Sequence, residues 1–317
     1  MAQFAPRWPT FCLVICTLLI NASAAAQQAP AKPRKQSPAT AQTFESKAFD
    51  RTVTYHLYVP PAYETNPEQR FPVVYWLHGS NGNSQVASSI ISLIFDNAIR
   101  AERIPPVILV FPDGMRQSMW VNAANGKLRM EDFLVDELVP HIDSTLRTIA
   151  DRANRMVEGG SMGGYGAARL GFRYPELFGA VSILSGGPLQ PVLDPTNAPI
   201  VGQKNAQRVL DQIYDGDPKI FRAQSPWQLA LEMPEDARAS IVVRQIVGDN
   251  DPVFGFNQQF AKHLNSLNIP HRMDVLQGIG HQPHLLFQAL IASESYWSFF
   301  ADVFGYEPAT ETVSRVK

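Results

Sequence analysis

The sequence predicts an α/β domain with a mostly parallel central sheet covered by helices on both faces. Short apolar runs at 71–79 ("FPVVYWLHG"), 105–114 and 240–248 contain almost no polar residue, which is typical of strands buried on both faces. Amphipathic stretches lie between them, such as 130–146, where apolar residues recur at helical spacing. Alternation of these two patterns indicates parallel strands joined by helical crossovers.

The predicted elements follow one another in the order that such a sheet requires. Residues 51–60 alternate polar and apolar side chains and end in two prolines, which indicates an antiparallel strand. Most of the later apolar runs are continuous and are followed by a helical stretch. The expected strands are 51–60, 71–79, 105–114, 154–160, 179–186, 240–248 and 271–278. The expected helices are 84–101, 130–146, 162–174, 256–268 and 284–304.

Short segments flank this domain. Residues 1–26 have a basic start at Arg7, a short apolar core and then small residues, the order of a secretory signal peptide. The apolar core is too short to cross ~30 Å of hydrocarbon, so we expect a secreted or periplasmic mature chain without a membrane span. Residues 27–43 are rich in Pro, Ala and Gln, which predicts a disordered tether. The remaining parts are a domain at 44–306, with an irregular insertion at 187–237, and a loose tail at 307–317.

Charge and cysteine usage argue against several functions. The formal net charge is −2 and the chain has no basic run, which argues against nucleic-acid binding. Cys12 and Cys16 both lie in the signal segment, so the mature chain is expected to have no disulfide, thiolate nucleophile or cysteine metal site. No two histidines are spaced like metal ligands. We therefore expect neither a metal nor a cofactor.

The stretch "EGGSMGG" carries the strongest chemical signal. It places Ser161 in a G-x-S-x-G motif, between a predicted strand and a predicted helix. A strand that turns at once into a helix strains the residue between them and exposes its side chain. A β-carbon two positions to either side, at Gly159 or Gly163, would collide with neighbouring backbone. The motif in this context predicts that Ser161 is a nucleophile.

A serine hydroxyl needs a base that removes its proton and an acid that orients the base. His281 follows the last predicted strand, and we favour it as the base over His284, which falls at the start of the final helix. The acid is expected after the preceding strand, where "GDND" offers Asp249 and Asp251. Spacing alone leaves both aspartates open.

Several stretches together resemble a known family. "YWLHGSNGN", "FPDGMRQSMWVN", "DFLVDELVPHID", "EGGSMGGYGAARLGFRYPELFGAVSILSG", "GDND" and "GIGH" occur in the order seen in the putative-esterase family of α/β-hydrolases. That family includes feruloyl and acetylxylan esterases, S-formylglutathione hydrolases of the esterase D type, enterochelin esterases and mycolyltransferases. The resemblance implies an α/β-hydrolase fold, and it places the triad acid at Asp251. The insertion at 187–237 comes just after the strand that follows the nucleophile helix, and this position predicts a lid or cap above the site.

The remaining site residues come from the loops around the serine. A tetrahedral intermediate needs backbone donors for its oxyanion, and the N–H of Met162 is expected to be one of them. The resemblance places the other at Ser80. Trp120, in a loop at the carboxyl end of a strand, either packs inside the domain or borders the substrate pocket. The resemblance implies the border of the pocket, where an aromatic plane suits a sugar or phenolic ring. His78 is expected to shape this substrate-binding region rather than to act as a base.

These residues predict an exported serine esterase that works through an acyl-enzyme. The expected partner is a small-molecule or carbohydrate ester, such as an acyl or feruloyl ester of polysaccharide. An acyltransferase of the same fold and an S-formylglutathione hydrolase-like esterase are the alternatives, and the latter type acts in the cytosol, against the signal segment. A non-catalytic binding module is least expected, because every triad member is present.

Overall fold

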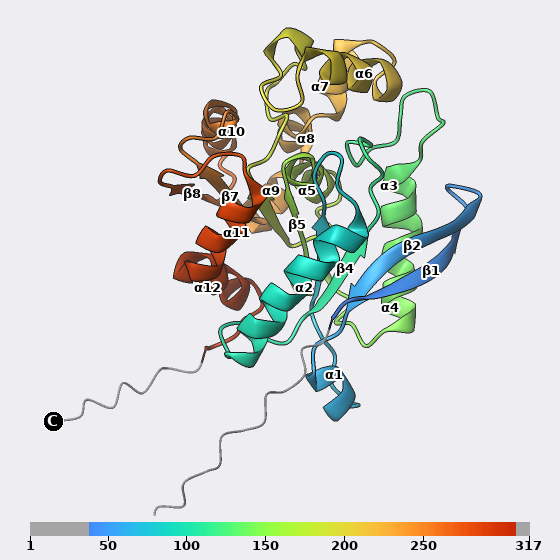
Figure 1. The fold of residues 1–317 in the computed structure, drawn as a ribbon, viewed down its shortest axis with the longest axis vertical. Helices are drawn as coiled ribbons and strands as arrows, with labels where there is room; N and C mark the ends of the chain where they lie inside the picture. Colours follow the sequence, from blue (N-terminus) through green and yellow to red (C-terminus); the bar gives the residue numbers. More distant parts are fainter. Residues whose placement is uncertain (1–37, 309–317) are drawn as a thin grey trace, which may run out of the picture. The chain divides into compact units, whose positions relative to one another are not determined.

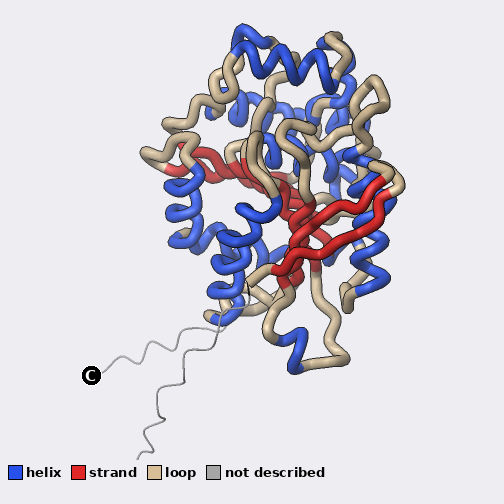
Figure 2. Tube along the Cα trace, turned by 45° about the vertical axis from the view of Figure 1, so that its right-hand side comes forward, coloured by secondary structure: helices blue, strands red, loops and turns tan. Residues whose placement is uncertain are grey.

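The computed structural model describes residues 38–308, which form an eight-stranded sheet of order β1-β2-β4-β3-β5-β6-β7-β8 (Figures 1 and 2). The strands are β1 (Thr40–Ser46), β2 (Arg51–Tyr58), β3 (Val73–Leu77), β4 (Ile108–Pro112), β5 (Arg155–Gly160), β6 (Ala180–Leu184), β7 (Val242–Gly248) and β8 (His271–Leu276). Pairing is antiparallel between β1, β2 and β4 and parallel from β4 to β8. The predicted mostly parallel sheet is confirmed.

Helices cover both faces of the sheet. They are α1 (Ala62–Thr65), α2 (Ser84–Arg100), α3 (Met130–Asp132), α4 (Val139–Thr145), α5 (Met162–Arg173), α6 (Gln203–Ile213), α7 (Pro218–Gln224), α8 (Pro226–Glu232), α9 (Glu235–Ser240), α10 (Phe254–Ser266), α11 (Pro283–Ala292) and α12 (Glu294–Val303). A π-helical segment, Phe133–Leu138, joins α3 to α4 within the predicted helix 130–146.

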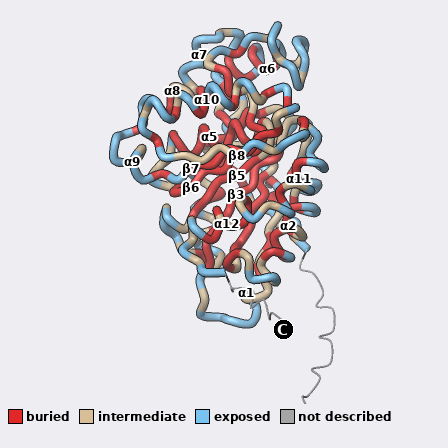
Figure 3. The backbone as a smooth tube through the Cα atoms, turned by 90° about the vertical axis from the view of Figure 1, so that its left-hand side faces the viewer, coloured by how far each residue is buried: buried red, intermediate tan, exposed pale blue. Residues whose placement is uncertain are grey.

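The alternation of side chains along β3 explains why its sequence is apolar throughout. Val73, Tyr75 and Leu77 belong to a core shared with α4, α5 and α10, whereas Val74 and Trp76 belong to a second core shared with α2, α11 and α12. Successive side chains of a strand point to opposite faces, so a strand between two helical layers buries every residue. Figure 3 shows this buried centre running through β3, β5 and β6.

The structure corrects three expectations about the elements. Residues 40–43 do not belong to a tether, because they lie in β1, which pairs with β2 through main-chain hydrogen bonds despite its polar composition. The final helix is two helices, since Ser293 ends α11 and its hydroxyl caps α12 by accepting the Tyr296 N–H. The 187–237 insertion is largely helical, and α6 buries Val209, Leu210 and Ile213 on one face.

Several expectations fall on other parts of the chain. The segment 1–26, residues 27–37 and the tail beyond Pro308 lie outside the described residues. Within residues 38–308, no helix is both long enough and apolar enough to cross a membrane. Residues 215–218, "DGDP", form the turn that leads into α7, and the Asp217 carboxylate caps this helix by accepting the Lys219 N–H.

Candidate active site

Ser161 lies on the sharp turn between β5 and α5. Its backbone has φ 56° and ψ −118°, a conformation that non-glycine residues rarely adopt. A β-carbon on Gly159 would lie 2.4 Å from the Gly163 carbonyl oxygen, and one on Gly163 would lie 2.0 Å from the Leu77 carbonyl oxygen. Glycine at both positions therefore lets β3, β5 and α5 approach closely enough to hold the strained turn. The collisions expected from the motif are confirmed.

The structure brings Ser161, His281 and Asp251 together in one hydrogen-bonded chain. The Nε2 atom of His281 lies 3.0 Å from the Ser161 Oγ atom. The Nδ1 atom lies 2.8 Å and 3.0 Å from the two carboxylate oxygens of Asp251. The Asp251 carboxylate is buried, while the His281 side chain is 18% exposed at the opening of the site. A neutral imidazole with Nδ1–H donated to Asp251 leaves its Nε2 lone pair directed at the serine.

Asp249 and His284, the alternatives to Asp251 and His281, do not join this hydrogen-bonded chain. The Asp249 carboxylate accepts the N–H of Gly278 at 2.7 Å and so fixes the loop after β8 instead of contacting His281. His284 is exposed in the first turn of α11. The geometry therefore selects Asp251 over Asp249 and His281 over His284 as partners of Ser161.

The two expected oxyanion donors lie beside the serine. Met162 is the first residue of α5, so its N–H has no acceptor within the helix. The Ser80 loop reaches the same place, because a β-carbon on Gly79 would lie 3.2 Å from the Ser161 Cβ atom. Among the hydrogen bonds of residues 38–308, neither the Met162 nor the Ser80 N–H has a protein acceptor. Both amides are thus free to receive a ligand oxygen near Ser161.

His78 is an internal support of this loop. Its Nε2 atom accepts the Gly114 N–H at 2.9 Å, which leaves the proton on Nδ1 for the Gly79 carbonyl oxygen at 2.9 Å. The side chain is 3% exposed. A histidine with both ring nitrogens engaged by backbone shapes the loop, as the sequence predicts, and has little surface left to contact a substrate.

The expectation that Trp120 borders the pocket is wrong in this structure. Its side chain is fully buried, and its Nε1–H donates to the His78 carbonyl oxygen at 3.3 Å. The indole fills the space left by Gly114 and Gly166, where added β-carbons would lie 2.3 Å and 2.5 Å from its ring. The neighbouring residue, Met119, lines the pocket instead.

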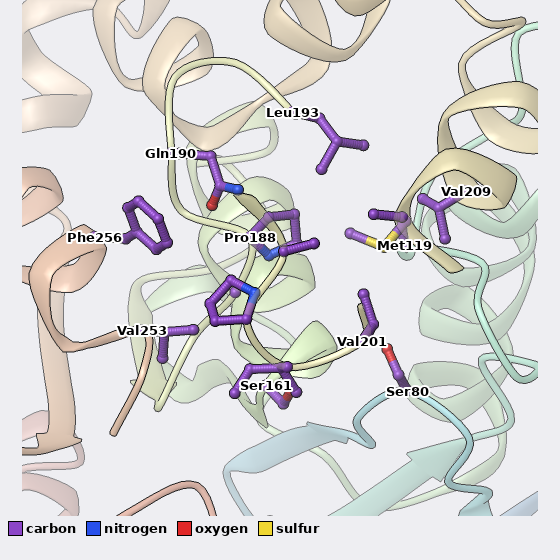
Figure 4. A pocket seen from close by; sticks show the side chains of 15 residues that line it. Ser80, Met119, Ser161, Pro188, Gln190, Leu193, Val201, Val209, Val253 and Phe256 are labelled. Atoms are coloured by element: carbon purple, nitrogen blue, oxygen red, sulfur yellow. The ribbon is translucent and has the colours of Figure 1, made fainter. Parts of the chain in front are cut away.

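A largely apolar pocket opens beside Ser161 under the insertion, and we call it the lid pocket (Figure 4). Its wall combines the turn after β6, the loop before α6, α6 itself and the start of α10. The lining side chains include Ser80, Met119, Pro188, Gln190, Leu193, Ile200, Val201, Val209, Val253 and Phe256. The sequence predicts that the insertion lies above the site, but no pattern in it marks these lining residues.

Gln190 is the polar exception in the lid pocket. It is 8% exposed, and its Oε1 atom is buried without a hydrogen-bond partner among the described residues. Figure 4 shows the carboxamide between Phe256 and Pro188. A buried amide oxygen without a partner costs free energy of about 1–3 kcal/mol. No sequence pattern marked this residue.

A buried ion pair lies beneath the serine turn. The Glu158 carboxylate, on β5, pairs with the Arg244 guanidinium at 2.9 Å and accepts hydrogen bonds from Trp76 and Tyr296. Neither charged side chain is exposed. Burial lowers the pKa of Arg244 and raises the pKa of Tyr296, and the Glu158 charge opposes the first effect and adds to the second. The network joins β3, β5, β7 and α12 below the site.

The described residues contain no cluster of His, Cys, Asp or Glu side chains that is able to hold a metal ion.

Comparisons with known proteins identify the family of the chain. A family model described as putative esterase matches residues 46–283. An endo-1,4-beta-xylanase/feruloyl esterase of Xylanibacter ruminicola is 36% identical over 157 residues, which cover 47% of this chain and 22% of the relative. An esterase of Mycobacterium tuberculosis is 30% identical over 146 residues, which cover 45% of this chain and 31% of the relative.

The chain thus spans less than a third of the length of these two relatives. Among solved structures, a ferulic acid esterase superposes with a TM-score of 0.70 at 23% identity, covering 85% of this chain and all of that one. This likeness supports the α/β-hydrolase fold. The chain belongs to the putative-esterase family.

Proposed function

We propose that the chain is a serine carboxylic-ester hydrolase that works through a Ser161–His281–Asp251 triad. The observation that carries the proposal is the continuous hydrogen-bonded chain from the buried Asp251 carboxylate to the Ser161 hydroxyl, at the opening of an apolar pocket. Nucleophile, base and orienting acid in this geometry are the parts that acyl transfer requires.

The reaction follows from the positions of these groups. His281 Nε2 takes the hydroxyl proton as Ser161 Oγ attacks the ester carbonyl, and Asp251 stabilises the imidazolium that forms. The carbonyl oxygen becomes an oxyanion that the Met162 and Ser80 N–H groups bind. The imidazolium then gives its proton to the departing alcohol, which leaves an acyl-enzyme. Water, activated by the same His281, releases the acid and restores Ser161.

The acyl group is proposed to lie in the lid pocket. Ser80, whose N–H is one of the two proposed oxyanion donors, lines this pocket with Ser161. A carbonyl bound by that N–H is proposed to direct its acyl chain toward the apolar wall. Gln190 gives this wall one hydrogen-bonding group. An acyl group with an apolar body and a polar atom at its far end, such as a feruloyl group, fits both features. The name of the Xylanibacter relative supports the same acyl class.

Export to the periplasm or the medium remains part of the proposal. It rests on the signal-like order of residues 1–26. An exported enzyme of this class meets esters of plant polysaccharide as well as simple alkyl and aryl esters, and the alcohol that its site accepts decides between them. The acyl group and the alcohol of the ester have to be identified by separate experiments.

The proposal is tested by comparing the chain with its Ser161→Ala variant on p-nitrophenyl acetate, p-nitrophenyl butyrate, methyl ferulate and acetylated xylan. We expect the unchanged chain to hydrolyse the p-nitrophenyl and methyl esters, and we expect a loss of at least a thousandfold in the variant, because the acyl-enzyme has no site to form. Acetylated xylan shows separately whether a sugar alcohol is accepted. A labelled fluorophosphonate should modify the unchanged chain and not the variant. An unchanged chain that neither cleaves these esters nor reacts with the fluorophosphonate would contradict the proposal.

A further inference from the structure

A second pocket reaches Ser161 between α2 and α11, and we call it the α2–α11 pocket. Its wall is formed by Val86, Ile90 and Ile91 of α2 and by Pro283, Leu286 and Phe287 of α11. Figures 1 and 3 both show these two helices next to each other on one face of the sheet. The Phe287 ring lies 6.1 Å from the Trp76 ring, which places the wall directly over β3. Nothing in the acyl-binding proposal uses this space.

The position of His281 distinguishes the two pockets. His281 lines the α2–α11 pocket and does not line the lid pocket, whereas Ser80 lines the lid pocket and does not line the α2–α11 pocket. The departing alcohol has to take its proton from His281 Nε2, and so it has to leave on the side of the imidazole. The oxyanion and acyl chain lie on the side of Ser80. The two halves of the ester therefore occupy different pockets.

The chemistry of the wall indicates which alcohol it receives. The residues that line the α2–α11 pocket, all of them described, include no Asp, Glu, Lys or Arg. Both ring nitrogens of His78 are engaged by backbone, and the Asn83 side-chain oxygen accepts the Val86 N–H at 2.8 Å. Among the lining residues, the Ser185 Oγ atom is the one buried polar atom without a partner in the described part of the chain. One hydroxyl cannot satisfy the several hydroxyls of a sugar, which would lose more hydrogen bonds to water than they gain.

The outer part of the wall is apolar and open to solvent. Val86 is 56% exposed and Ile90 is 47% exposed, and both lie on α2 at the edge of the pocket. Exposed aliphatic side chains that continue into a pocket beside a reactive serine favour the burial of an alkyl chain. We propose that the α2–α11 pocket binds the alcohol half of the ester and that this alcohol is an alkyl or aryl group rather than a sugar. The assignment rests on the proposed esterase function.

The test uses acetate esters that differ only in their alcohol: methyl, butyl and hexyl acetate, and a glucose monoacetate. Release of acetic acid gives kcat/KM for each. We expect hexyl acetate to exceed methyl acetate by about tenfold or more, the order expected when two or more methylene groups are buried. The glucose ester should be no better than methyl acetate. A flat alcohol series, or a glucose ester that is the best substrate, would overturn the assignment.

Three variants test which pocket is responsible for each substrate preference. Ile90→Asn should lower the hexyl-to-methyl ratio at least fivefold. Ile291→Asn is the matched control, because Ile291 lies on α11 with a similar exposure, 43%, and outside the lining of either pocket. It should leave both the ratio and the rates unchanged. Ile200→Asn, in the lid pocket, should instead lower the preference for ethyl hexanoate over ethyl acetate.

The outcomes separate this assignment from the esterase proposal. If Ile90→Asn changed the acyl series and Ile200→Asn changed the alcohol series, the two halves would be assigned the wrong way round. If the unchanged chain cleaved methyl acetate without any alcohol preference, the assignment alone would fail. If it cleaved no ester and Ser161 resisted the fluorophosphonate, the esterase proposal and this assignment would both fail.

Discussion

The carbonyl oxygen of Ile279 lies against Gly248, so closely that a β-carbon on Gly248 would be 1.9 Å from it. The same carbonyl oxygen accepts the Asn250 N–H at 3.1 Å. Gly248 ends β7, just before Asp251, and Ile279 lies two residues before His281. This contact joins the loop that carries the acid to the loop that carries the base.

Gly248→Ala tests the contact. The added methyl group has to push the two loops apart, and displacements of about 1 Å at a catalytic group cost on the order of a hundredfold in rate. We expect kcat for p-nitrophenyl acetate to fall by about that factor while circular dichroism stays unchanged. Gly255→Ala is the control, because a β-carbon there meets no atom within 4 Å. A Gly248→Ala variant within threefold of normal activity would show that the loops tolerate separation.

The two neighbouring aspartates should behave differently. Asp251→Asn keeps the shape of the side chain but removes the charge that holds the His281 tautomer, and we expect kcat to fall by about 10⁴. Asp249→Asn keeps an acceptor for the Gly278 N–H and should lower kcat by less than about tenfold. Steady-state kinetics on one chromogenic ester measures both. Equal losses of kcat in the two variants would contradict the assignment of Asp251 as the triad acid.

Gln190 should determine selectivity for a polar atom on the acyl group. Gln190→Leu should lower the kcat/KM ratio of methyl 4-hydroxycinnamate over methyl cinnamate by about fivefold, since one hydrogen bond is worth about 1 kcal/mol. The same variant should raise the free energy of unfolding by about 1 kcal/mol, because it removes a buried amide oxygen that has no partner among residues 38–308.

Gln224→Leu is the control for this experiment. The Gln224 side-chain oxygen also lacks a partner in the described part of the chain, but the residue lines neither pocket. It should leave the substrate ratio unchanged. A ratio that stays constant in Gln190→Leu would exclude contact between this amide and the acyl group.

The ion pair beneath the serine turn should dominate the electrostatic part of the stability. Glu158→Gln leaves the fully buried Arg244 guanidinium without its counter-charge, which costs about 3–5 kcal/mol of unfolding free energy. Glu294→Gln breaks the Arg103 pair at the surface, where Glu294 is 88% exposed, and should cost less than about 1 kcal/mol. Urea denaturation of the two variants gives both values. A Glu158→Gln cost as small as that of the surface pair would contradict this prediction.

Mild acid should destabilise the fold through His141. Burial lowers the pKa of His141 in the folded chain below its usual 6.5, so the unfolded chain binds the proton first as the pH falls. The stability from this group is fully present above about pH 6.5 and is lost as the pH falls through the folded pKa. His141→Gln should therefore show a smaller drop in Tm between pH 7.5 and pH 5 than the unchanged chain. An equal drop would contradict the linkage.

The sequence predicted the parts of the site that depend on nearby residues. Ser161 could be identified because the close approaches at Gly159 and Gly163 leave a local pattern. Asp251 could not be chosen by spacing, because the difference from Asp249 is a hydrogen bond to Gly278, which lies 29 residues away. The resemblance to the family supplied that choice.

Other features depend on distant segments that meet only in the fold. Trp120 is buried because Gly114 and Gly166, from two different segments, leave room for its ring, so its loop position in the sequence was misleading. β1 forms because β2 offers it a strand edge, although the composition of 40–46 is polar. The helices of the insertion, by contrast, have a readable signal, since the buried residues of α6 recur at helical spacing.

Ser161 is the one residue that lines both the lid pocket and the α2–α11 pocket in the described part of the chain. Under the two assignments, the two products of one turnover leave from different pockets and at different times. The alcohol departs while the acyl group is still bound covalently to Ser161. The emptied α2–α11 pocket is then open to water or to another nucleophile from the solvent. In mixtures of water and butanol, the same intermediate should divide between free acid and butyl ester, so the medium would decide whether the protein degrades esters or exchanges them.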